Sequence, residues 1–396
     1  MKKRRLCIMT GTRAEWGLFY PLATEIKNNK GRNILQIVAT GAHLSPEYGL
    51  TYREIEGDGF RIDRKVKLPL SRDTAGAIAG SVSAGITGFT KALRALKPDA
   101  VFLLGDRFES LAAGVACLFL KIPIAHINGG ELTEGSLDES LRHAITKMSF
   151  LHFVSTDTYR NRVIQMGEAP ERVFNVGTLG LDNIANTELF KRDEFEKKIK
   201  FKLGKRNIII TFNPMTAEKR SVSEEQLKHL LGVVGGLADT KVIITRPNPD
   251  MYSKMINALI DRFVSHRRDK VACFTSMGRS LYLSALRHMD VVAGNSSSGI
   301  IEAPSFGIPT VNVGTRQLGR IKTASIIDAD GSLNSIKRAF RIAYSADFRN
   351  ICRNVKNPYG DGRAAKRIVD IMKRADLSNA KKSFFDLKLD SVGKHK

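Results

Sequence analysis

Short, almost unbroken apolar runs alternate with longer amphipathic stretches along most of the 396-residue chain. In the first half the runs lie at Leu6–Met9, Leu35–Ala39, Ala100–Leu104, Ile122–Ile127, Leu151–Ser155 and Val173–Val176. Their Val, Ile, Leu and Phe residues are typical of strands covered on both faces. The stretches Ala14–Lys27, Ala75–Leu96, Phe108–Leu120 and Leu137–Met148 have helical spacing. The pattern predicts βα units on a parallel sheet.

The alternation breaks at 185–205, where the chain is polar, densely charged and without a strand pattern. It resumes with strand-like runs at Asn207–Phe212, Lys241–Thr245, Val271–Phe274, Val291–Ala293 and Pro309–Val313, and helical stretches at Ser223–Leu237, Tyr252–Val264 and Ser335–Tyr344. We therefore predict two doubly wound α/β domains, 1–187 and 205–362. A helix at 363–376 should cross back onto the first domain, and 377–396 should form a mobile tail. Ligands bind beyond the carboxyl ends of such strands, so we expect the two domains to face a shared cleft.

Composition narrows the class of protein. Hydrophobic residues make up 42% and charged residues 26% of the chain, which is usual for a soluble globular protein. No apolar run approaches the roughly 20 residues of a membrane helix. The basic start MKKRRLCIMT leads into GTRAEWG without a cleavage site, so we interpret Arg5–Thr10 as a core strand and predict a cytoplasmic protein. The spacing of the four cysteines indicates neither a zinc site nor a disulfide framework.

The net charge of +23 is compatible with nucleic acid, a membrane surface or an anionic substrate. The basic residues are spread along the whole chain, and no motif of an RNA-binding sheet or a recognition helix is present. We therefore predict an anionic small-molecule substrate, with no nucleic acid partner and no integral membrane association.

Three carboxylates follow two successive predicted strands of the first domain. Asp106 comes directly after Ala100–Leu104, while Glu131 and Asp138 follow Ile122–Ile127. If they converge, each raises the pKa of the others, which prepares one as a proton donor and another as a base. The alternatives are helix caps and solvated loop carboxylates. A metal site is a further alternative, which the absence of a ligand spacing disfavours.

The turn Gly11-Thr12-Arg13 closes the first strand. Thr12 can cap the next helix, whose N–H groups and Arg13 could hold an anion. The alternative is a capped turn with an exposed arginine. The turn lacks the G-x-G-x-x-G pattern of NAD-binding proteins. His43, in TGAHLSPEYG, is a candidate for lining a sugar site, or a loop histidine with satisfied hydrogen bonds.

The second domain carries a loop of small polar residues, Gly294-Asn295-Ser296-Ser297-Ser298-Gly299, after a predicted strand. Ser296 and Ser297 could cradle a diphosphate, although a flexible serine loop is the alternative. Glu302 follows one turn later, where it could accept both ribose hydroxyls. Arg316 ends the next strand as a further phosphate contact, and the turn at Ser276 could approach the base. The Gly-Lys-Ser/Thr ending of a P-loop is absent.

Seven motifs occur in one order: GTRAEWG, TGAHLSPEYG, LGDRFE, HINGGE, DESLRHAITKMS, GNSSSGIIEAPSFGIPTVNVGTRQ and NPYGDG. In this the chain resembles the hydrolysing UDP-N-acetylglucosamine 2-epimerases, and most of all their sialic- and legionaminic-acid branch, over about residues 5–375. The resemblance implies the two-domain fold of the GT-B nucleotide-sugar glycosyltransferases. It also implies a UDP-sugar substrate, no metal or nicotinamide, and a homodimer or homotetramer.

The resemblance also implies a reaction. A base removes the sugar C2 proton while the nucleoside diphosphate leaves C1, and water adds to the resulting 2-acetamidoglucal to release a C2-inverted sugar. Asp106, Glu131 and Asp138 resemble the acidic catalytic positions, without an assignment of acid and base. The residues that resemble nucleotide-binding positions are Arg13, Ser296, Ser297, Glu302 and Arg316.

The chain departs from the family pattern at Asn213-Pro214, where the family usually has His-Pro in contact with the leaving diphosphate. Asn213 can donate a hydrogen bond but has no proton to transfer near neutral pH. A second departure is Asn128 in HINGGE.

Two alternatives to the hydrolysing epimerase stay open. One is a glycosyltransferase with the same fold, which the carboxylate trio disfavours. The other is a sugar-nucleotide binder weakened by Asn213. UDP-N-acetylglucosamine, UDP-N,N'-diacetylbacillosamine and a GDP sugar all stay open as substrates.

Overall fold

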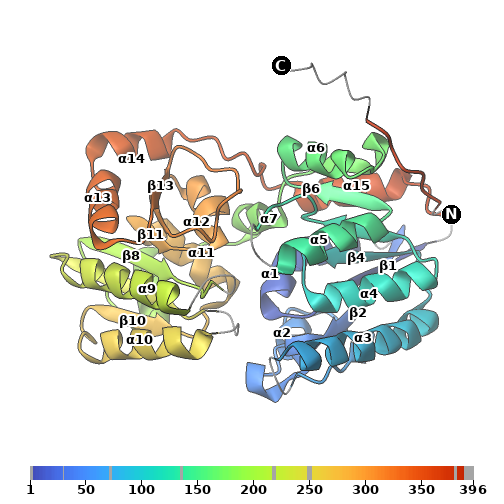
Figure 1. Ribbon diagram of the computed structural model, residues 1–396, viewed down its shortest axis with the longest axis horizontal. Coiled ribbons are helices and arrows are strands. Elements are labelled where there is room, and N and C mark those ends of the chain that lie inside the picture. The colour runs from blue at the N-terminus through green and yellow to red at the C-terminus, as the bar shows by residue number, and fades with distance from the viewer. Residues whose placement is uncertain are drawn as a thin grey trace, which may run out of the picture. The chain divides into compact units, whose positions relative to one another are not determined.

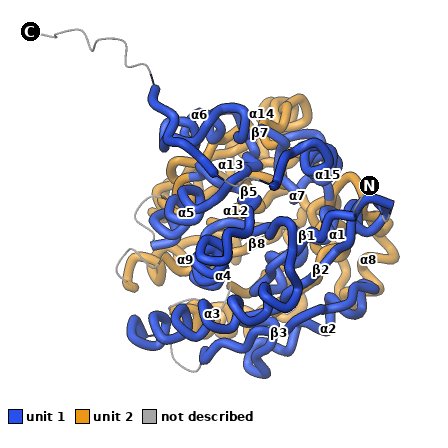
Figure 2. Tube along the Cα trace, turned by 90° about the vertical axis from the view of Figure 1, so that its right-hand side faces the viewer, with its two compact units in different colours: residues 1–131, 137–182, 360–396 blue, residues 132–136, 183–359 orange. Residues whose placement is uncertain are grey.

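The computed structural model describes residues 3–29, 31–70, 74–133, 137–215, 220–247, 252–378 and 381–387. The chain folds into two compact units, coloured separately in Figure 2. The first unit combines Met1–Glu131, Leu137–Asp182 and the segment from Gly360 onward, and the second is essentially Asn183–Tyr359. The first unit is therefore built from chain segments that precede and follow Asn183–Tyr359 in sequence.

The first unit contains a seven-stranded sheet in which every neighbouring pair is parallel. Its order is β3-β2-β1-β4-β5-β6-β7. The strands are β1 Arg4–Thr10, β2 Asn33–Thr40, β3 Arg64–Val66, β4 Ala100–Leu104, β5 Ile124–Ile127, β6 Leu151–Val154 and β7 Val173–Asn175. The strand order reverses between β1 and β4, as in a doubly wound sheet.

Helices cover both faces of this sheet, as Figure 1 shows. The first-unit helices are α1 Arg13–Asn28, α2 Tyr52–Gly57, α3 Ala75–Leu96, α4 Phe108–Phe119, α5 Leu137–Met148, α6 Asp157–Gln165 and α15 Ala364–Arg374; α7 Leu179–Asn186 crosses the unit boundary. One core cluster joins α1 and α15 to the sheet through residues such as Trp16 and Ile368. Another packs α3, α4 and α5 on it through residues such as Phe89 and Ile145.

Helix α15 belongs to the first unit. Asp182 accepts hydrogen bonds from the backbone N–H groups of Ala364, at 2.8 Å, and Ala365, at 2.6 Å. These bonds satisfy two of the free N–H groups at the start of the helix.

The second unit repeats the architecture with six parallel strands in the order β10-β9-β8-β11-β12-β13. Its strands are β8 Arg206–Thr211, β9 Thr240–Thr245, β10 Val271–Phe274, β11 Val291–Gly294, β12 Thr310–Val313 and β13 Ile326–Ala329. Its helices are α8 Arg192–Ile199, α9 Arg220–Gly235, α10 Ser253–Ser265, α11 Gly278–His288, α12 Ser297–Ile301, α13 Leu333–Ala343 and α14 Ala346–Arg353. Short 3₁₀ helices lie at Gly41–Leu44, Pro46–Tyr48, Pro170–Arg172 and Ala303–Phe306. The prediction of two doubly wound α/β sheets is thus confirmed.

The charged segment 185–205, where the sequence pattern shows no strand, contains helix α8. Its apolar residues Phe195 and Ile199 are buried in a core cluster of the second unit, together with Leu203. Apart from the buried Glu196, the charged residues of α8 are exposed, which is why the segment is densely charged in sequence. The chain passes between the units at Asp182, a few residues before this segment.

The C-terminal segment 381–387 lies against the first unit, so the prediction of a mobile tail is wrong for these residues. The ammonium group of Lys382 lies 2.9 and 2.7 Å from the two carboxylate oxygens of Glu168. The backbone N–H of Phe385 donates to the carbonyl of Gly167 at 3.0 Å. Residues 379–380 and 388–396 lie outside the described residues.

In the part of the chain that the structure describes, no helix is at once long and apolar enough to span a membrane.

Candidate functional site

In the first unit the candidate residues begin at the two loops where the strand order reverses, after β1 and β4. The carboxylate of Glu15 accepts hydrogen bonds from the N–H groups of Gly11, at 2.7 Å, and Thr12, at 3.0 Å. The Thr12 hydroxyl accepts one from the N–H of Glu15 at 3.2 Å, which completes a capping box. The N–H of Glu15, in the first turn of the helix, is therefore taken by the cap, and an anion contact by the other N–H groups of that turn stays a prediction.

Arg13 begins helix α1 beside this cap. Its side chain is 37% exposed and lies 3.8 Å from a carboxylate oxygen of Glu54. The local structure is the capped turn with an exposed arginine. A nucleotide contact by Arg13 stays a prediction.

Sequence reasoning missed a pair of buried carboxylates at this point of the sheet, Glu15 and Glu109. Glu109 is 1% exposed, and the Arg107 guanidinium donates to both of its carboxylate oxygens at 3.1 Å. Burial raises the pKa of Glu15 to about 7, with Arg107 opposing and Glu109 adding to the rise. The sequence did carry a signal, because Gly-x-Arg-x-Glu occurs both at Gly11–Glu15 and at Gly105–Glu109.

Arg142 connects the loops that carry Asp106 and Glu131. Its guanidinium donates to the Asp106 carboxylate and, at 2.8 Å, to the main-chain carbonyl of Glu131. The arginine side chain is 3% exposed, whereas that of Asp106 is 26% exposed. The structure thus links two of the three predicted acidic residues through a third residue that was not singled out.

The other two carboxylates differ in surroundings. Glu131 is 4% exposed, and the Ser155 hydroxyl donates to its carboxylate at 3.4 Å. Asp138 is exposed and lies in the first turn of α5, one helical turn before Arg142. The set therefore comprises one buried, one partly exposed and one exposed carboxylate. Acid/base work for all three stays a prediction.

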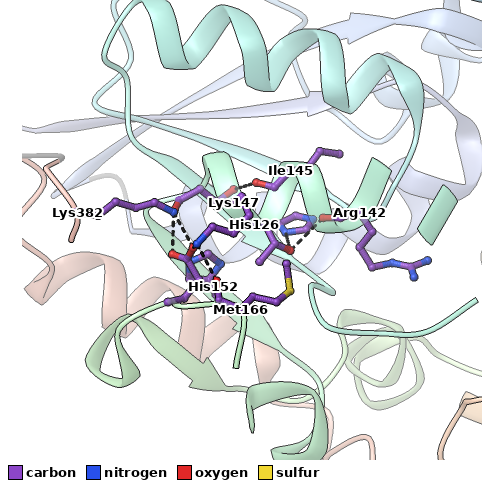
Figure 3. A network of polar contacts seen from close by, with 10 residues as sticks. His126, Arg142, Ile145, Lys147, His152, Met166 and Lys382 are labelled. Carbon is purple, nitrogen blue, oxygen red and sulfur yellow. Dashed lines mark hydrogen bonds and ion pairs between the residues drawn. The ribbon is translucent and has the colours of Figure 1, made fainter. Parts of the chain in front are cut away.

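His126 forms hydrogen bonds with the loop that carries Asp106 and with helix α5. It is fully buried at the end of β5, with Nε2 at 2.8 Å from the carbonyl of Gly105 and Nδ1 at 3.1 Å from the Thr146 hydroxyl. The Thr146 hydroxyl also lies 3.0 Å from the carbonyl of Arg142, so His126 and α5 share one network (Figure 3). Burial lowers the pKa of His126 to about 3, and the neutral ring therefore fixes the position of the Gly105–Asp106 turn.

His43 is a loop histidine with satisfied hydrogen bonds. It is fully buried, with Nε2 at 3.1 Å from the Thr10 hydroxyl and Nδ1 at 2.9 Å from the Thr51 hydroxyl. Burial lowers its pKa to about 4. The local structure is thus that of a satisfied loop histidine, and a sugar contact by His43 stays a prediction.

In the second unit the strand order reverses between β8 and β11, and the buried Asn295 joins the loops there. Its side chain accepts from the N–H of Asn213 at 2.7 Å and donates to the Asn213 carbonyl at 2.8 Å. Its own carbonyl accepts from the side chains of Arg316, at 3.2 Å, and Gln317, at 2.8 Å. Asn295 therefore brings Asn213, Ser296 and Arg316 together. Sequence reasoning placed Asn295 in the loop without giving it this role.

A tight approach of the backbone shapes this loop. Gly294 has a φ of +121°, and a Cβ there would lie 2.1 Å from the carbonyl oxygen of Thr211. Only glycine fits at this point. The absent side chain lets β8 and β11 end side by side at the reversal.

The serine loop and Glu302 lie at opposite ends of the short helix α12. Ser296 caps α12, its hydroxyl accepting from the N–H of Ser298 at 3.3 Å, and Ser297 is the first helical residue. Glu302 follows at the C-terminal end, where burial raises its pKa and a bond from Ser298 opposes the rise. The Tyr282 hydroxyl donates to that of Ser298 at 2.6 Å. The predicted phosphate and ribose contacts thus share one hydrogen-bonded element, with Tyr282 as an added member.

Ser276 forms a local turn, its hydroxyl accepting from the N–H of Gly278 at 3.0 Å. Its contact with a base stays a prediction. Among the described residues, no three His, Cys, Asp or Glu side chains are grouped as ligands of a metal ion would be.

Comparison with known proteins yields concordant matches. Residues 25–373 match the family model described as UDP-N-acetylglucosamine 2-epimerase. The GDP/UDP-N,N'-diacetylbacillosamine 2-epimerase (hydrolyzing) of Campylobacter jejuni subsp. jejuni serotype O:2 is 41% identical over 349 residues, covering 88% of this chain and 90% of that one. The UDP-N,N'-diacetylbacillosamine 2-epimerase (hydrolyzing) of Legionella pneumophila subsp. pneumophila is 34% identical over 377 residues, covering 94% and 97%.

Among solved structures, UDP-GlcNAc 2-epimerase from Neisseria meningitidis bound to UDP-GlcNAc matches with a TM-score of 0.76 at 18% identity. The match covers 94% of this chain and 100% of that one. This likeness concerns the fold.

Proposed function

The chain belongs to the UDP-N-acetylglucosamine 2-epimerase family, and on that premise we propose that it is a hydrolysing 2-epimerase of a UDP-linked 2-acetamido sugar. The observation that carries the proposal is its 41% identity, over 88% of its length, to a relative named as a hydrolyzing 2-epimerase. The alternative of a glycosyltransferase has no comparable support.

The reaction has two steps. In the first, a carboxylate takes the proton from sugar C2 while the C1–O bond breaks, so that UDP leaves with the bonding electrons and a 2-acetamidoglucal remains. In the second, the oxygen of a water molecule bonds to C1 and loses one proton to a carboxylate, while a carboxyl group donates a proton to C2 on the opposite face. The products are UDP and the free C2-inverted sugar.

We propose Asp106, Glu131 and Asp138 as the groups that move these protons. Arg142 supports this assignment because its guanidinium fixes the orientation of the Asp106 carboxylate and of the Glu131 loop. General acid or base help typically contributes about 10²–10⁴-fold to rate.

For UDP we propose a site in the second unit. Ser296, Ser297 and Arg316 hold the diphosphate, Glu302 accepts the ribose hydroxyls, and Ser276 contacts the base. Asn213, anchored by its backbone to Asn295, donates a hydrogen bond to the leaving diphosphate. Since an amide transfers no proton near neutral pH, the leaving group departs as the UDP anion.

The substrate that we propose is UDP-N,N'-diacetylbacillosamine, the sugar in the names of both relatives. We propose assembly as a homodimer or homotetramer.

The experiment is a proton NMR time course in D₂O with UDP-N,N'-diacetylbacillosamine, UDP-N-acetylglucosamine and GDP-N,N'-diacetylbacillosamine in separate samples. We expect free UDP and a C2-inverted, C2-deuterated sugar, fastest from UDP-N,N'-diacetylbacillosamine. Faster turnover of another substrate would reject the substrate, and absence of a deuterated free sugar from all three would reject the reaction.

A matched pair of variants tests the carboxylate chemistry. We expect Glu131→Gln to abolish turnover while calorimetry still detects UDP binding. Glu56→Gln, whose carboxylate forms an exposed pair with Lys65 at 3.3 Å, should leave both unchanged. Wild-type turnover by Glu131→Gln would remove Glu131 from the mechanism.

A further inference from the structure

The C-terminal segment 381–387 ends a network that reaches the candidate acidic site through helix α5. Its anchor is Lys382, whose ammonium group lies 2.9 and 2.7 Å from the two carboxylate oxygens of Glu168 and donates to the carbonyl of Ser149 at 2.9 Å. The ring of Phe384 lies 4.9 Å from the ammonium nitrogen of Lys147. Figure 3 shows Lys382 at one end of this network and Arg142 at the other.

Glu168 is a buried carboxylate whose negative charge is stabilised by neighbouring cations. It is 2% exposed, and it also accepts from Lys147 at 2.6 Å and from Nε2 of His152 at 3.1 Å. Burial alone would raise the pKa of Glu168, yet the bonds from His152, Lys147 and Lys382 hold it at about 2. An unpaired carboxylate at this depth would be costly.

His152 cannot replace Lys382 as a cation. It is fully buried, and burial lowers its pKa. Because Nε2 donates to Glu168, the neutral ring leaves Nδ1 without a proton, and Nδ1 has no hydrogen-bond partner among the described residues. Glu168 therefore depends on Lys147, which is 40% exposed, and on Lys382, which is 25% exposed.

Both lysines act at the C-terminal end of α5. Lys147 lies in its last turn and also donates to the carbonyl of Met166 at 2.8 Å, while Lys382 bonds the carbonyl of Ser149, directly after the helix ends. The Ser149 hydroxyl in turn donates to the carbonyl of Ile145 at 2.7 Å. Positive charge is favourable at this end of a helix.

Helix α5 also carries the contacts to the acidic loops, through Arg142 and Thr146. Arg142 bonds Asp106 and the Glu131 loop, and Thr146 bonds His126, which holds the Gly105 carbonyl. A shift of α5 along its axis would move Arg142 and Thr146 together. The contacts of Lys382 at the C-terminal end of α5 therefore help to determine the positions of the loops that carry Asp106 and Glu131.

We propose that Lys382 is a positioning residue for the reaction: by completing the charge balance of Glu168 at the end of α5, it fixes the helix that carries Arg142 and Asp138. The proposal rests on the proposed function, since it assumes that the acidic loops perform the chemistry. It makes segment 381–387 part of the working enzyme.

The test compares Lys382→Met, which keeps most of the stem, with Lys382→Arg, which restores a cation. We expect Lys382→Met to lower kcat about ten-fold with KM and UDP affinity unchanged, because small misplacements at a reacting centre are costly and the proposed UDP contacts are in the second unit. Lys382→Arg should recover most of kcat. Lys366→Met, which removes an exposed pair with Asp370 at 2.8 Å, is the control and should keep wild-type kcat.

Hydrogen exchange of α5, measured without substrate, separates this proposal from the proposed function. Faster exchange at 142–149 in Lys382→Met than in Lys366→Met is expected even if no sugar is turned over. Unchanged exchange, or wild-type kcat with faster exchange, would overturn the positioning role. If Lys382→Met does not fold, Phe385→Pro removes the bond to Gly167 without neutralising a lysine, and the same two readouts apply.

Discussion

Replacing Arg142 by Met isolates the link between the acidic loops. Met keeps an unbranched stem and a good helix propensity, so α5 itself should persist. The change removes the guanidinium donors to the Asp106 carboxylate and to the Glu131 carbonyl, the latter at 2.8 Å. It leaves both acceptors without this partner.

The expected cost follows from the exposure of each acceptor. A hydrogen bond to a charged group contributes about 1.5–3 kcal/mol, and the Asp106 side chain, 26% exposed, can partly rehydrate, so the lower end applies. The Glu131 backbone lies in a buried loop, where an unsatisfied carbonyl costs about 1–3 kcal/mol. We expect a loss of about 2.5–4.5 kcal/mol in the free energy of unfolding, slightly less than the ~3–5 kcal/mol of breaking a fully buried pair. Turnover should fall about 10²-fold as the loops lose their alignment.

Urea unfolding, monitored by circular dichroism, measures the free energy of unfolding, and the rate of UDP release measures turnover. The control is Arg160→Met, since Arg160 donates to the carbonyls of Val173, at 3.0 Å, and Pro170, at 3.2 Å, in the same unit. It should lose stability without a comparable loss of kcat. Wild-type kcat in Arg142→Met, or equal kcat losses in the two variants, would refute the link.

Three other outcomes are expected. Because burial holds the pKa of His126 at about 3 and of His43 at about 4, below the unfolded value of 6.5, the unfolded chain binds more protons at these two groups between about pH 6.5 and 3. Glu15, with a pKa raised to about 7, acts in the opposite direction but is one group against two. The urea midpoint should therefore fall from pH 7 to pH 5, and an equal midpoint would contradict this. Glu302→Gln should weaken UDP binding about ten-fold, as measured by calorimetry. The control Glu225→Gln, at an exposed site, should bind UDP like the wild type. Equal UDP affinities of the two variants would exclude a ribose contact by Glu302. Gly130 has a φ of +76°, and a Cβ there would lie 2.5 Å from the Tyr159 carbonyl oxygen, so Gly130→Ala should lower the free energy of unfolding by ~1–3 kcal/mol. Gly80→Ala, in open space on α3, should raise it by ~0.5–1 kcal/mol. Thermal unfolding shifts of the same sign in both variants would contradict the steric argument.

Every central strand was predicted, and so were the edge strands β7 and β10, whereas the other two edge strands were not. Ala100–Leu104 was predicted with the bounds of β4, because a strand buried on both faces is apolar at every position. The edge strands β3 and β13 were missed, since Arg64 and Lys65 in one and Asp328 in the other are exposed and interrupt the pattern. The missed helix α8 has the same cause, a short apolar face among many charges.

The candidate site was predictable as far as it depends on strand ends. Asp106 was singled out because it directly follows a buried strand, and the structure brings it to Arg142. Arg142 lies within the quoted DESLRHAITKMS motif, yet its partners are 36 and 11 residues away and depend on the packing of α5. The capping box, by contrast, is local: Thr12 and Glu15 have the Thr-x-x-Glu spacing that specifies it, and that spacing could have been read.

The interrupted first unit has a consequence for synthesis on the ribosome. Asp182 caps α15 across 182 residues of sequence, and the apolar face of Ile368 and Met372 joins Trp16 in one core. Domains generally fold as units in the order of their synthesis. The unit that starts first is finished last, since its core stays open until α15 emerges. The second unit, by contrast, is complete once Tyr359 has emerged. A nascent chain stalled before Ala364 would therefore carry one finished unit and one with an exposed apolar face, a target for chaperones or proteases.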